Sequence, residues 1–452
     1  MNFIRLVVFS LLIGVPSIVS ARPASLYLTD WLAAFNSGEK ATIQNFYSEH
    51  LVDRDVLTAR NLREETCGFD LVRVEDESDK SFSALLSQRC FPALFRVSFT
   101  VAEEGKTLAK FNVKPFAMSE ERVLAASRDI ADRLAKADAF AGSLIVARDG
   151  EEPWIYDAGT FSREDARPIT FDTPMFLASA GKMFTAVGIL QLVERGKVEL
   201  DAPLSRYIPD YPNKDVAKVT IRQLLSHRGG TGEDGILRRE DTANRAWVRT
   251  INDFIKLNGN RAPDFPPGSK TDYSNYGFLL LGAVIERLSG QTYQDFIQRN
   301  VFDPAGMKYA SFPDREHLAG IPVGYSTFFE SEPGPIKNTE VLPWRGSAAG
   351  GGVASATDLL RFFAALRSHK LLSAQSLAIA TVPGDTPWYG LGFIAQAGKH
   401  AVWGHGGSSY GMSVAAQRYP SKKTTFICLA TRDMACDRII YAWFDRTFGL
   451  TE

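Results

Sequence analysis

The sequence has no excess of charge of either sign. Its 51 lysines and arginines balance 52 aspartates and glutamates, which leaves a formal net charge of −1. Proteins whose main partner is a nucleic acid or an anionic membrane carry a large basic surplus or a basic stripe. Neither partner is therefore expected. Internal repeats and low-complexity tracts are also absent, and the composition, with 45% hydrophobic and 23% charged residues, is that of an ordinary soluble globular protein.

Cysteine and histidine are scarce, with four of the first and six of the second. No CxxC pair occurs and no histidine clusters with the cysteines, which excludes the common zinc patterns. No nucleotide-binding motif is found either, so neither a metal nor a cofactor is predicted. Cys67 and Cys90 bracket two strand-like runs, 69–75 and 81–88, with a polar turn between them. Folding that hairpin places the two cysteines opposite each other, which predicts a Cys67–Cys90 disulfide.

Long apolar runs are missing except at the N-terminus. A positively charged start over residues 2–5 precedes an apolar run from Leu6 to Val19, and small residues follow up to Ala21. This is the pattern of a secretory signal peptide at residues 1–21, cleaved after Ala21. The alternative is a membrane anchor, but the run is too short to span a bilayer comfortably. The mature chain is therefore expected to have no stable membrane span and to be periplasmic or secreted.

The length of 452 residues exceeds a typical single core, so two or more domains are expected. In residues 22–116, apolar residues at helical spacing predict a helix that Gly38 ends, then a second helix that runs to Leu51, then strand-like runs. Two helices before a curved antiparallel sheet, with the phrase from Trp31 to Gly38, resemble the cone-shaped nuclear-transport-factor-2-like domains. The polar residues of an active site are not evident. This favours a dimerisation or spacer module, and a homo-oligomer through this domain is one expectation.

The larger predicted body covers residues 120–452. Its first two strand-like runs, 144–148 and 154–158, flank the turn at Asp149-Gly150 and form a hairpin signal. A helix-rich middle, from about 182 to 367, separates them from a second set of predicted strands. These later strands lie near 389–397, 400–404, 412–419 and 424–430, before a last helix at 437–448. We therefore expect one sheet built from both ends of the body, with a helical insertion.

Ser179 and Lys182 form an SxxK motif at the start of an apolar helical pattern. Their spacing puts both side chains on one face of a helix N-terminus. Ser179 is interpreted as a nucleophile, because the lysine amine is within reach and the helix N-terminus favours developing negative charge. Lys182 must be neutral for part of the cycle, and burial would lower its pKa from the usual value near ~10.4. A second SxxK, from Ser37 to Lys40, straddles a predicted helix end and lacks this context.

Tyr273-Ser274-Asn275 lies on a short loop that enters an apolar helix over 278–288. A phenol at Tyr273 can relay protons between serine, lysine and leaving group. The amide of Asn275 can hold a substrate carbonyl and the lysine ammonium at once. The alternative is a buried tyrosine beside a helix-capping Ser274 or Asn275. A second Tyr-x-Asn match at 211–213 lies in a proline-bearing surface loop.

His405 begins a His-Gly-Gly-Ser phrase near the C-terminus, at the end of a strand-like run. The two glycines, of which Gly407 is the second, let backbone approach a ligand closely. A substrate is expected to pair along this strand, with the N–H groups of Ser408 and Ser179 as oxyanion donors. His405 would add a titratable donor. Residues 407–411 also fit the GxSxG elbow of α/β-hydrolases, but that motif needs a downstream histidine and His405 is the last one.

These motifs, in this order, resemble the serine β-lactamase and penicillin-binding-protein family. The branch is the one that contains class C β-lactamases, D-alanyl-D-alanine carboxypeptidases and related esterases. The resemblance covers about residues 125–445, and it rests on the phrases Ser179-Ala180-Gly181-Lys182, Leu224-Leu225-Ser226-His227, Tyr273-Ser274-Asn275-Tyr276-Gly277, Gly350-Gly351-Gly352-Val353-Ala354-Ser355 and His405-Gly406-Gly407. It implies an α+β fold in which the antiparallel sheet of an α/β/α sandwich lies beside a helical subdomain, with the site between them. It also implies catalytic roles for Ser179, Lys182 and Tyr273.

One departure from the family concerns the substrate. Class C enzymes have Lys-Thr-Gly where this chain has His-Gly-Gly from His405, so a lysine contact to a substrate carboxylate and a threonine hydroxyl are missing. Efficient antibiotic hydrolysis is therefore not expected. We predict a serine hydrolase that acts on a D-amino-acid peptide or small ester through a Ser179 acyl-enzyme. The alternatives are a non-catalytic or slowly deacylating receptor for peptidoglycan or a β-lactam, and an assembly protein dominated by residues 22–116. His227 is interpreted as a structural hydrogen-bonding residue.

Overall fold

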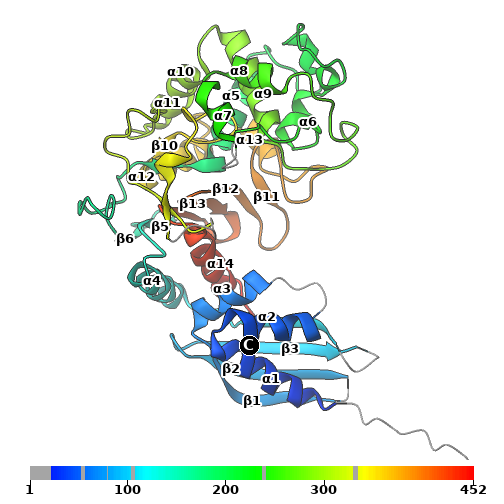
Figure 1. Cartoon of the computed structure of the whole chain (residues 1–452), viewed down its shortest axis with the longest axis vertical. Coiled ribbons are helices and arrows are strands. Elements are labelled where there is room, and N and C mark those ends of the chain that lie inside the picture. The colour runs from blue at the N-terminus through cyan, green and yellow to red at the C-terminus, as the bar shows by residue number, and fades with distance from the viewer. Residues whose placement is uncertain are drawn as a thin grey trace, which may run out of the picture. The chain divides into compact units, whose positions relative to one another are not determined.

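The computed structural model describes residues 22–51, 56–78, 80–102, 107–236, 241–328 and 334–451. The predicted signal peptide at residues 1–21 lies outside them. The chain divides into two compact units, one made of the residues up to Ala117 together with those from Gly449 onward, the other of Met118–Phe448 (Figure 1). Among the described residues, no helix has both the length and the apolar character to cross a membrane.

The first unit packs three helices against a four-stranded sheet. The helices are α1 (Ala24–Ser37), α2 (Lys40–His50) and α3 (Val56–Thr66), and the antiparallel strands, in the order β1-β2-β3-β4, are β1 (Phe69–Glu77), β2 (Ser81–Gln88), β3 (Leu94–Val101) and β4 (Leu108–Pro115). Gly38 ends α1 in the left-handed conformation, as predicted. The sequence predicted two helices, so α3 is a correction. The predicted Cys67–Cys90 disulfide is present and closes the β1–β2 hairpin.

The core of the first unit is aromatic. Trp31 on α1 is fully buried and stacks on Phe35, with ring centroids 4.9 Å apart. Phe111 on β4 meets the same indole edge-on at 5.3 Å. The C-terminal residues belong to this unit, because the N–H of Leu450 donates to the carbonyl of Pro115 at 2.9 Å.

The second unit is built on a six-stranded antiparallel sheet with the order β11-β12-β13-β14-β5-β6. The strands are β5 (Gly142–Arg148), β6 (Trp154–Ala158), β11 (Ile394–Gln396), β12 (Val402–Ser409), β13 (Met412–Tyr419) and β14 (Thr424–Ala430). Because β14 pairs with β5, one sheet is formed from both ends of the unit, as predicted. The predicted strand at 389–397 shortens to β11, because Gly392 takes a left-handed turn (φ 82°) within it.

Helices cover both faces of this sheet. On one face, α4 (Glu120–Lys136) and α14 (Ala435–Thr447) pack together over a core that includes Leu144, Phe426 and Trp443. A second disulfide, Cys428–Cys436, which the sequence analysis did not predict, joins β14 to α14. On the other face lie α5 (Lys182–Glu194) and α12 (Ala356–Arg367), in the large core that also contains the helical region (Figure 1).

The helical region and the connections hold the remaining elements. The helices are α6 (Ile221–Leu225), α7 (Thr242–Trp247), α8 (Ile251–Asn258), α9 (Asn275–Ser289), α10 (Tyr293–Ile297), α11 (Asp303–Ala305) and α13 (Ala374–Ala380), and the π-helical turn is η5 (Gln298–Phe302). The 3-10 turns are η1 (Ala178–Gly181), η2 (Leu204–Arg206), η3 (Val216–Lys218), η6 (Asn338–Glu340) and η7 (Pro420–Lys422). Two short pairs, β7 (Met175–Phe176) with β10 (Val353–Ala354) and β8 (Tyr325–Ser326) with β9 (Ile336–Lys337), complete the unit.

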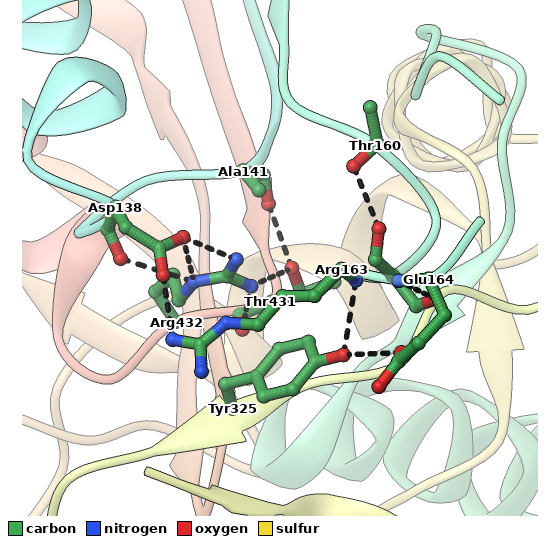
Figure 2. A network of polar contacts seen from close by, with 9 residues as sticks. Asp138, Ala141, Thr160, Arg163, Glu164, Tyr325, Thr431 and Arg432 are labelled. Carbon is green, nitrogen blue, oxygen red and sulfur yellow. Dashed lines mark hydrogen bonds and ion pairs between the residues drawn. The ribbon is translucent and has the colours of Figure 1, made fainter. Parts of the chain in front are cut away.

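A polar network ties the β8 segment to the end of β14 (Figure 2). The ring of Tyr325 lies within 4.5 Å of the Arg163 guanidinium and 4.9 Å of that of Arg432. Its hydroxyl accepts from the N–H of Arg163 and donates to the carboxylate of Glu164 at 3.1 Å. Both arginines also pair with Asp138, Arg163 at 2.7 Å and Arg432 at 2.5 Å. The Tyr325 hydroxyl, the two carboxylates and both guanidiniums have partners within this network, so we interpret it as a structural brace.

Candidate active site

Ser179 lies on the tight turn η1, immediately before α5. The residue before it, Ala178, has a left-handed backbone (φ 45°), which is uncommon for a residue with a side chain and is often found at functional sites. Because η1 runs directly into α5, Lys182 follows one turn later on the same side. The Nζ atom of Lys182 lies 3.3 Å from the Oγ atom of Ser179. The predicted contact between these two side chains is therefore present.

Lys182 is completely buried and is held by two further acceptors. Its Nζ atom donates to the Oδ1 atom of Asn275 at 2.7 Å and to the backbone carbonyl of Ala349. With the Ser179 hydroxyl, these groups place three oxygen atoms around the Lys182 amine. The Nδ2 atom of Asn275 in turn donates to the carboxylate of Glu233 at 2.8 Å, which fixes the amide so that its oxygen faces the lysine. Sequence reasoning missed Glu233, because no local pattern links it to α9.

Tyr273 lies on the loop that enters α9, as predicted. Its ring centroid is 4.8 Å from the Nζ atom of Lys182, and the ring of Phe278 lies on the same amine at 5.4 Å. The hydroxyl of Ser274 caps α9 by accepting from the N–H of Gly277 at 2.9 Å. The capping role weighed for Ser274 is thus present together with the placement of Tyr273 near the lysine.

Strand β12 lies directly against the serine turn. A Cβ atom built on Gly407 would lie 2.4 Å from the carbonyl oxygen of Leu177 and 3.1 Å from the backbone nitrogen of Ser179. Only a glycine permits this approach. The next residue, Ser408, lines the same pocket as Ser179. The structure therefore brings together the segments that hold the predicted oxyanion donors.

A second glycine segment, Gly350 to Gly352, packs on the same turn. The N–H of Gly351 donates to the carbonyl of Ala178 at 2.8 Å, and the carbonyl of Gly352 accepts from the N–H of Leu177 at 3.2 Å. The turn is thus held between β12 and this segment. No role was predicted for these three consecutive glycines, although such a run is itself a signal of close backbone approach.

His405 departs from its prediction. Its ring is buried and both nitrogens are engaged, Nε2 with the hydroxyl of Tyr389 at 2.8 Å and Nδ1 with the carbonyl of Gly406. Burial, together with the positive charge of Lys182, lowers the pKa of His405 to about 3. The expectation of a titratable donor is therefore wrong, because the ring stays neutral near pH 7. A contact between His405 and substrate stays a prediction.

A pocket opens beside Ser179, entirely within the second unit. Its polar lining includes Asn275, Ser408 and Asp234, and burial raises the pKa of the Asp234 carboxyl to about 6. Much of its wall is apolar, formed by Phe176, Ile236, Phe254, Leu318, Val341, Leu342, Pro343, Trp344 and Met412. Among the described residues, no group of three or more His, Cys, Asp or Glu side chains could hold a metal ion.

Comparisons with known proteins agree on one family. A family model described as Beta-lactamase matches residues 126–439. Penicillin-binding protein 4* of Bacillus subtilis (strain 168) is 29% identical over 313 residues, 65% of this chain and 68% of that protein. Esterase EstB of Burkholderia gladioli is 27% identical over 331 residues, 64% of this chain and 83% of that protein. The crystal structure of a D-stereospecific amidohydrolase from Streptomyces sp. superposes with a TM-score of 0.59 at 27% identity, covering 71% of this chain and 98% of that one.

Proposed function

The chain belongs to the β-lactamase family, and from this premise we propose that it is a serine hydrolase that cleaves an ester or amide through an acyl-enzyme on Ser179. The similar proteins named above are a penicillin-binding protein, an esterase and a D-stereospecific amidohydrolase, which supports this reaction class. The observation that carries the proposal is the 3.3 Å contact between the buried Lys182 amine and the Ser179 hydroxyl. An amine removed from water beside a hydroxyl is the arrangement that activates a serine nucleophile.

The proposed reaction has two steps. The Oγ atom of Ser179 attacks the substrate carbonyl carbon while its proton passes to the Lys182–Tyr273 pair. The bond to the leaving group then breaks, and the same proton goes to the departing oxygen or nitrogen. The N–H groups of Ser179 and Ser408 stabilise the oxyanion. In the second step a water molecule attacks the acyl carbon and gives a proton to the Lys182–Tyr273 pair. The ester bond to Ser179 breaks, that proton returns to the Ser179 oxygen, and the acid product leaves.

Asn275 has a positioning role in this scheme. Its amide oxygen accepts from Lys182 at 2.7 Å, and its nitrogen is held by Glu233 at 2.8 Å. These two hydrogen bonds keep the Lys182 amine directed at Ser179 while substrate binds. The apolar pocket wall and the loss of Lys-Thr-Gly favour a D-amino-acid peptide or small ester over a β-lactam.

The test is replacement of Ser179 by Ala, with Ser37→Ala as the matched control from the second SxxK phrase. Chromogenic esters, D-Ala-D-Ala peptides and a cephalosporin are assayed with all three proteins, and each is treated with a serine-directed fluorophosphonate. We expect Ser179→Ala to lose both turnover and covalent labelling, while Ser37→Ala keeps both. Undiminished turnover in Ser179→Ala would end the proposal. A stable acyl adduct without turnover in the unmodified protein would instead favour the receptor alternative.

A further inference from the structure

The proposal that follows rests on the function proposed above and concerns His227, which ends the Leu-Leu-Ser-His phrase. We propose that His227 is a positioning residue that fixes the catalytic phenol of Tyr273 from both sides. Its backbone carbonyl accepts from the N–H of Asp272 at 2.9 Å, and its Nδ1 atom accepts from the N–H of Ser274 at 3.1 Å. These are the residues immediately before and after Tyr273. One histidine therefore holds a backbone N–H on each side of Tyr273, that of Asp272 and that of Ser274.

The imidazole ring also packs on the phenol itself. The centroids of the His227 and Tyr273 rings are 4.2 Å apart, with the planes tilted by 31°. Phe278 and Tyr389 enclose the imidazole at 5.1 Å and 4.5 Å, and His227 is only 1% exposed. The phenol therefore has a rigid surface on the imidazole side, while the Lys182 amine lies 4.8 Å from its ring.

The hydrogen bonds of His227 exclude a role as proton carrier. Because Nδ1 accepts from a backbone N–H, the ring proton is on Nε2, and that buried atom has no hydrogen-bond partner among the described residues. Neither nitrogen can accept a proton from Ser179. Burial and then the charge of Lys182 hold the pKa of His227 well below its ordinary value, which agrees with a neutral ring. An apolar side chain at this position would leave no buried N–H without a partner. Histidine bears that cost, so we infer that the position requires the Nδ1 atom as an acceptor.

His227 also links two active-site segments. The ring of Tyr389 packs on His227 at 4.5 Å, and its hydroxyl bonds to His405 on β12 at 2.8 Å. A displaced imidazole would therefore disturb Tyr273, which it touches directly, more than strand β12, which it reaches only through Tyr389. Because Tyr273 is affected most, we expect a loss in the chemical step rather than in substrate binding.

The experiment compares His227→Asn with His227→Leu. Asparagine can keep the acceptor for Ser274 and tolerates the left-handed backbone of His227 (φ 59°). Leucine removes the acceptor. The control is His369→Leu, because His369 has the same backbone conformation (φ 58°) and is exposed. It shows what leucine at a positive φ does to folding where no acceptor is lost. All rates are divided by the number of sites that react with fluorophosphonate, so that unfolded protein is not counted.

We expect His227→Leu to lower kcat by about 100-fold with little change in KM, the size of loss that a misplaced catalytic group gives. His227→Asn should recover most of that loss, and its pH–rate profile should keep the shape of the unmodified protein. His369→Leu should match the unmodified protein. Unchanged kcat in His227→Leu, or equal losses in the leucine and asparagine variants, would overturn the proposal. Failure of the hydrolase proposal is separate, because it appears as activity that survives in Ser179→Ala.

Discussion

At the scale of single residues, the second unit keeps two histidines neutral inside its core. His227 and His405 are both almost completely buried, and each lies in a ring cluster that shares Tyr389. A buried imidazole that cannot take up a proton makes the folded state sensitive to acid, because the unfolded chain can take it up. The cost of this arrangement is a loss of stability at low pH, whereas stability near pH 7 is unaffected.

The first prediction follows from the pKa of His405, which burial lowers from its ordinary value of 6.5 to about 3 in the folded state. Above pH 6.5 both states are neutral and the full stability is present. Between pH 6.5 and 3 the unfolded state binds one more proton, so His405 lowers the free energy of unfolding by about 1.4 kcal/mol per pH unit as the pH falls. His405→Gln keeps an acceptor for Tyr389 but cannot be protonated, so its pH dependence should be shallower by that amount. Urea unfolding between pH 6 and 4 measures both slopes.

Other titrating groups do not obscure this comparison. Burial raises the pKa of Asp234 to about 6, so that carboxyl titrates in the same range with the opposite sign, but it is present in both proteins and cancels in the difference. Equal slopes for the unmodified protein and His405→Gln would contradict the prediction.

At the scale of elements, the site depends on three segments that meet at the serine turn η1. Strand β12 presses on it through Gly407, the glycine segment at 350–352 bonds to it, and α5 continues from it. Backbone contacts, rather than long side chains, hold the first two segments. The proposed oxyanion site therefore depends on glycine at particular positions, because a single Cβ atom would separate the segments.

The second prediction is that Gly407→Ala disables the site while Gly406→Ala does not. A Cβ atom at Gly407 would lie 2.4 Å from the carbonyl of Leu177, so β12 must move away from Ser179. At Gly406 the nearest contact is the carbonyl of Val414 at 3.5 Å, which is ordinary packing. We expect kcat/KM for a chromogenic ester to fall by about 100-fold for Gly407→Ala, because catalytic groups shifted by about 1 Å lose activity on that scale. Equal effects of the two substitutions, with both proteins folded, would contradict it.

The sequence was sufficient for features that depend on local spacing. Ser179 and Lys182 are one helical turn apart, so their contact follows from the period of the helix. One sheet built from both ends of the body was also predicted, and the pairing of β14 with β5 confirms it. Gly38 as a helix end and the Cys67–Cys90 hairpin are equally local.

Several contacts between single residues distant in sequence were not predicted. The bond from Asn275 to Glu233 joins residues 42 apart, and the bond from Ser274 to His227 joins residues 47 apart. In neither pair does the spacing along the sequence indicate a contact. The burial of His405 was also missed, because its partner Tyr389 was assigned to a regular strand that the glycine turn interrupts. The role of a side chain as an acceptor becomes visible only when its neighbours are placed.

At the scale of the whole molecule, the described groups proposed for catalysis lie in one of the two units. The groups that contact Lys182 and the pocket beside Ser179 all come from Met118–Phe448. Each unit has its own disulfide, Cys67–Cys90 in the first and Cys428–Cys436 in the second. Export through residues 1–21 stays a prediction, as does a role of the first unit in dimerisation.

The third prediction is that a chain of residues 118–448 keeps the proposed activity. Every described group assigned to catalysis is inside it, and so is the Cys428–Cys436 disulfide. We expect its rate of labelling by fluorophosphonate to lie within about threefold of the full chain, since proximity and orientation of the reacting groups set that rate. The shorter chain carrying Ser179→Ala is the control and should not label. Size-exclusion chromatography with light scattering on both lengths then tests the first unit separately. A smaller oligomer for the shorter chain would support assembly through residues 22–117, whereas a folded shorter chain that fails to label would show that catalysis needs the first unit.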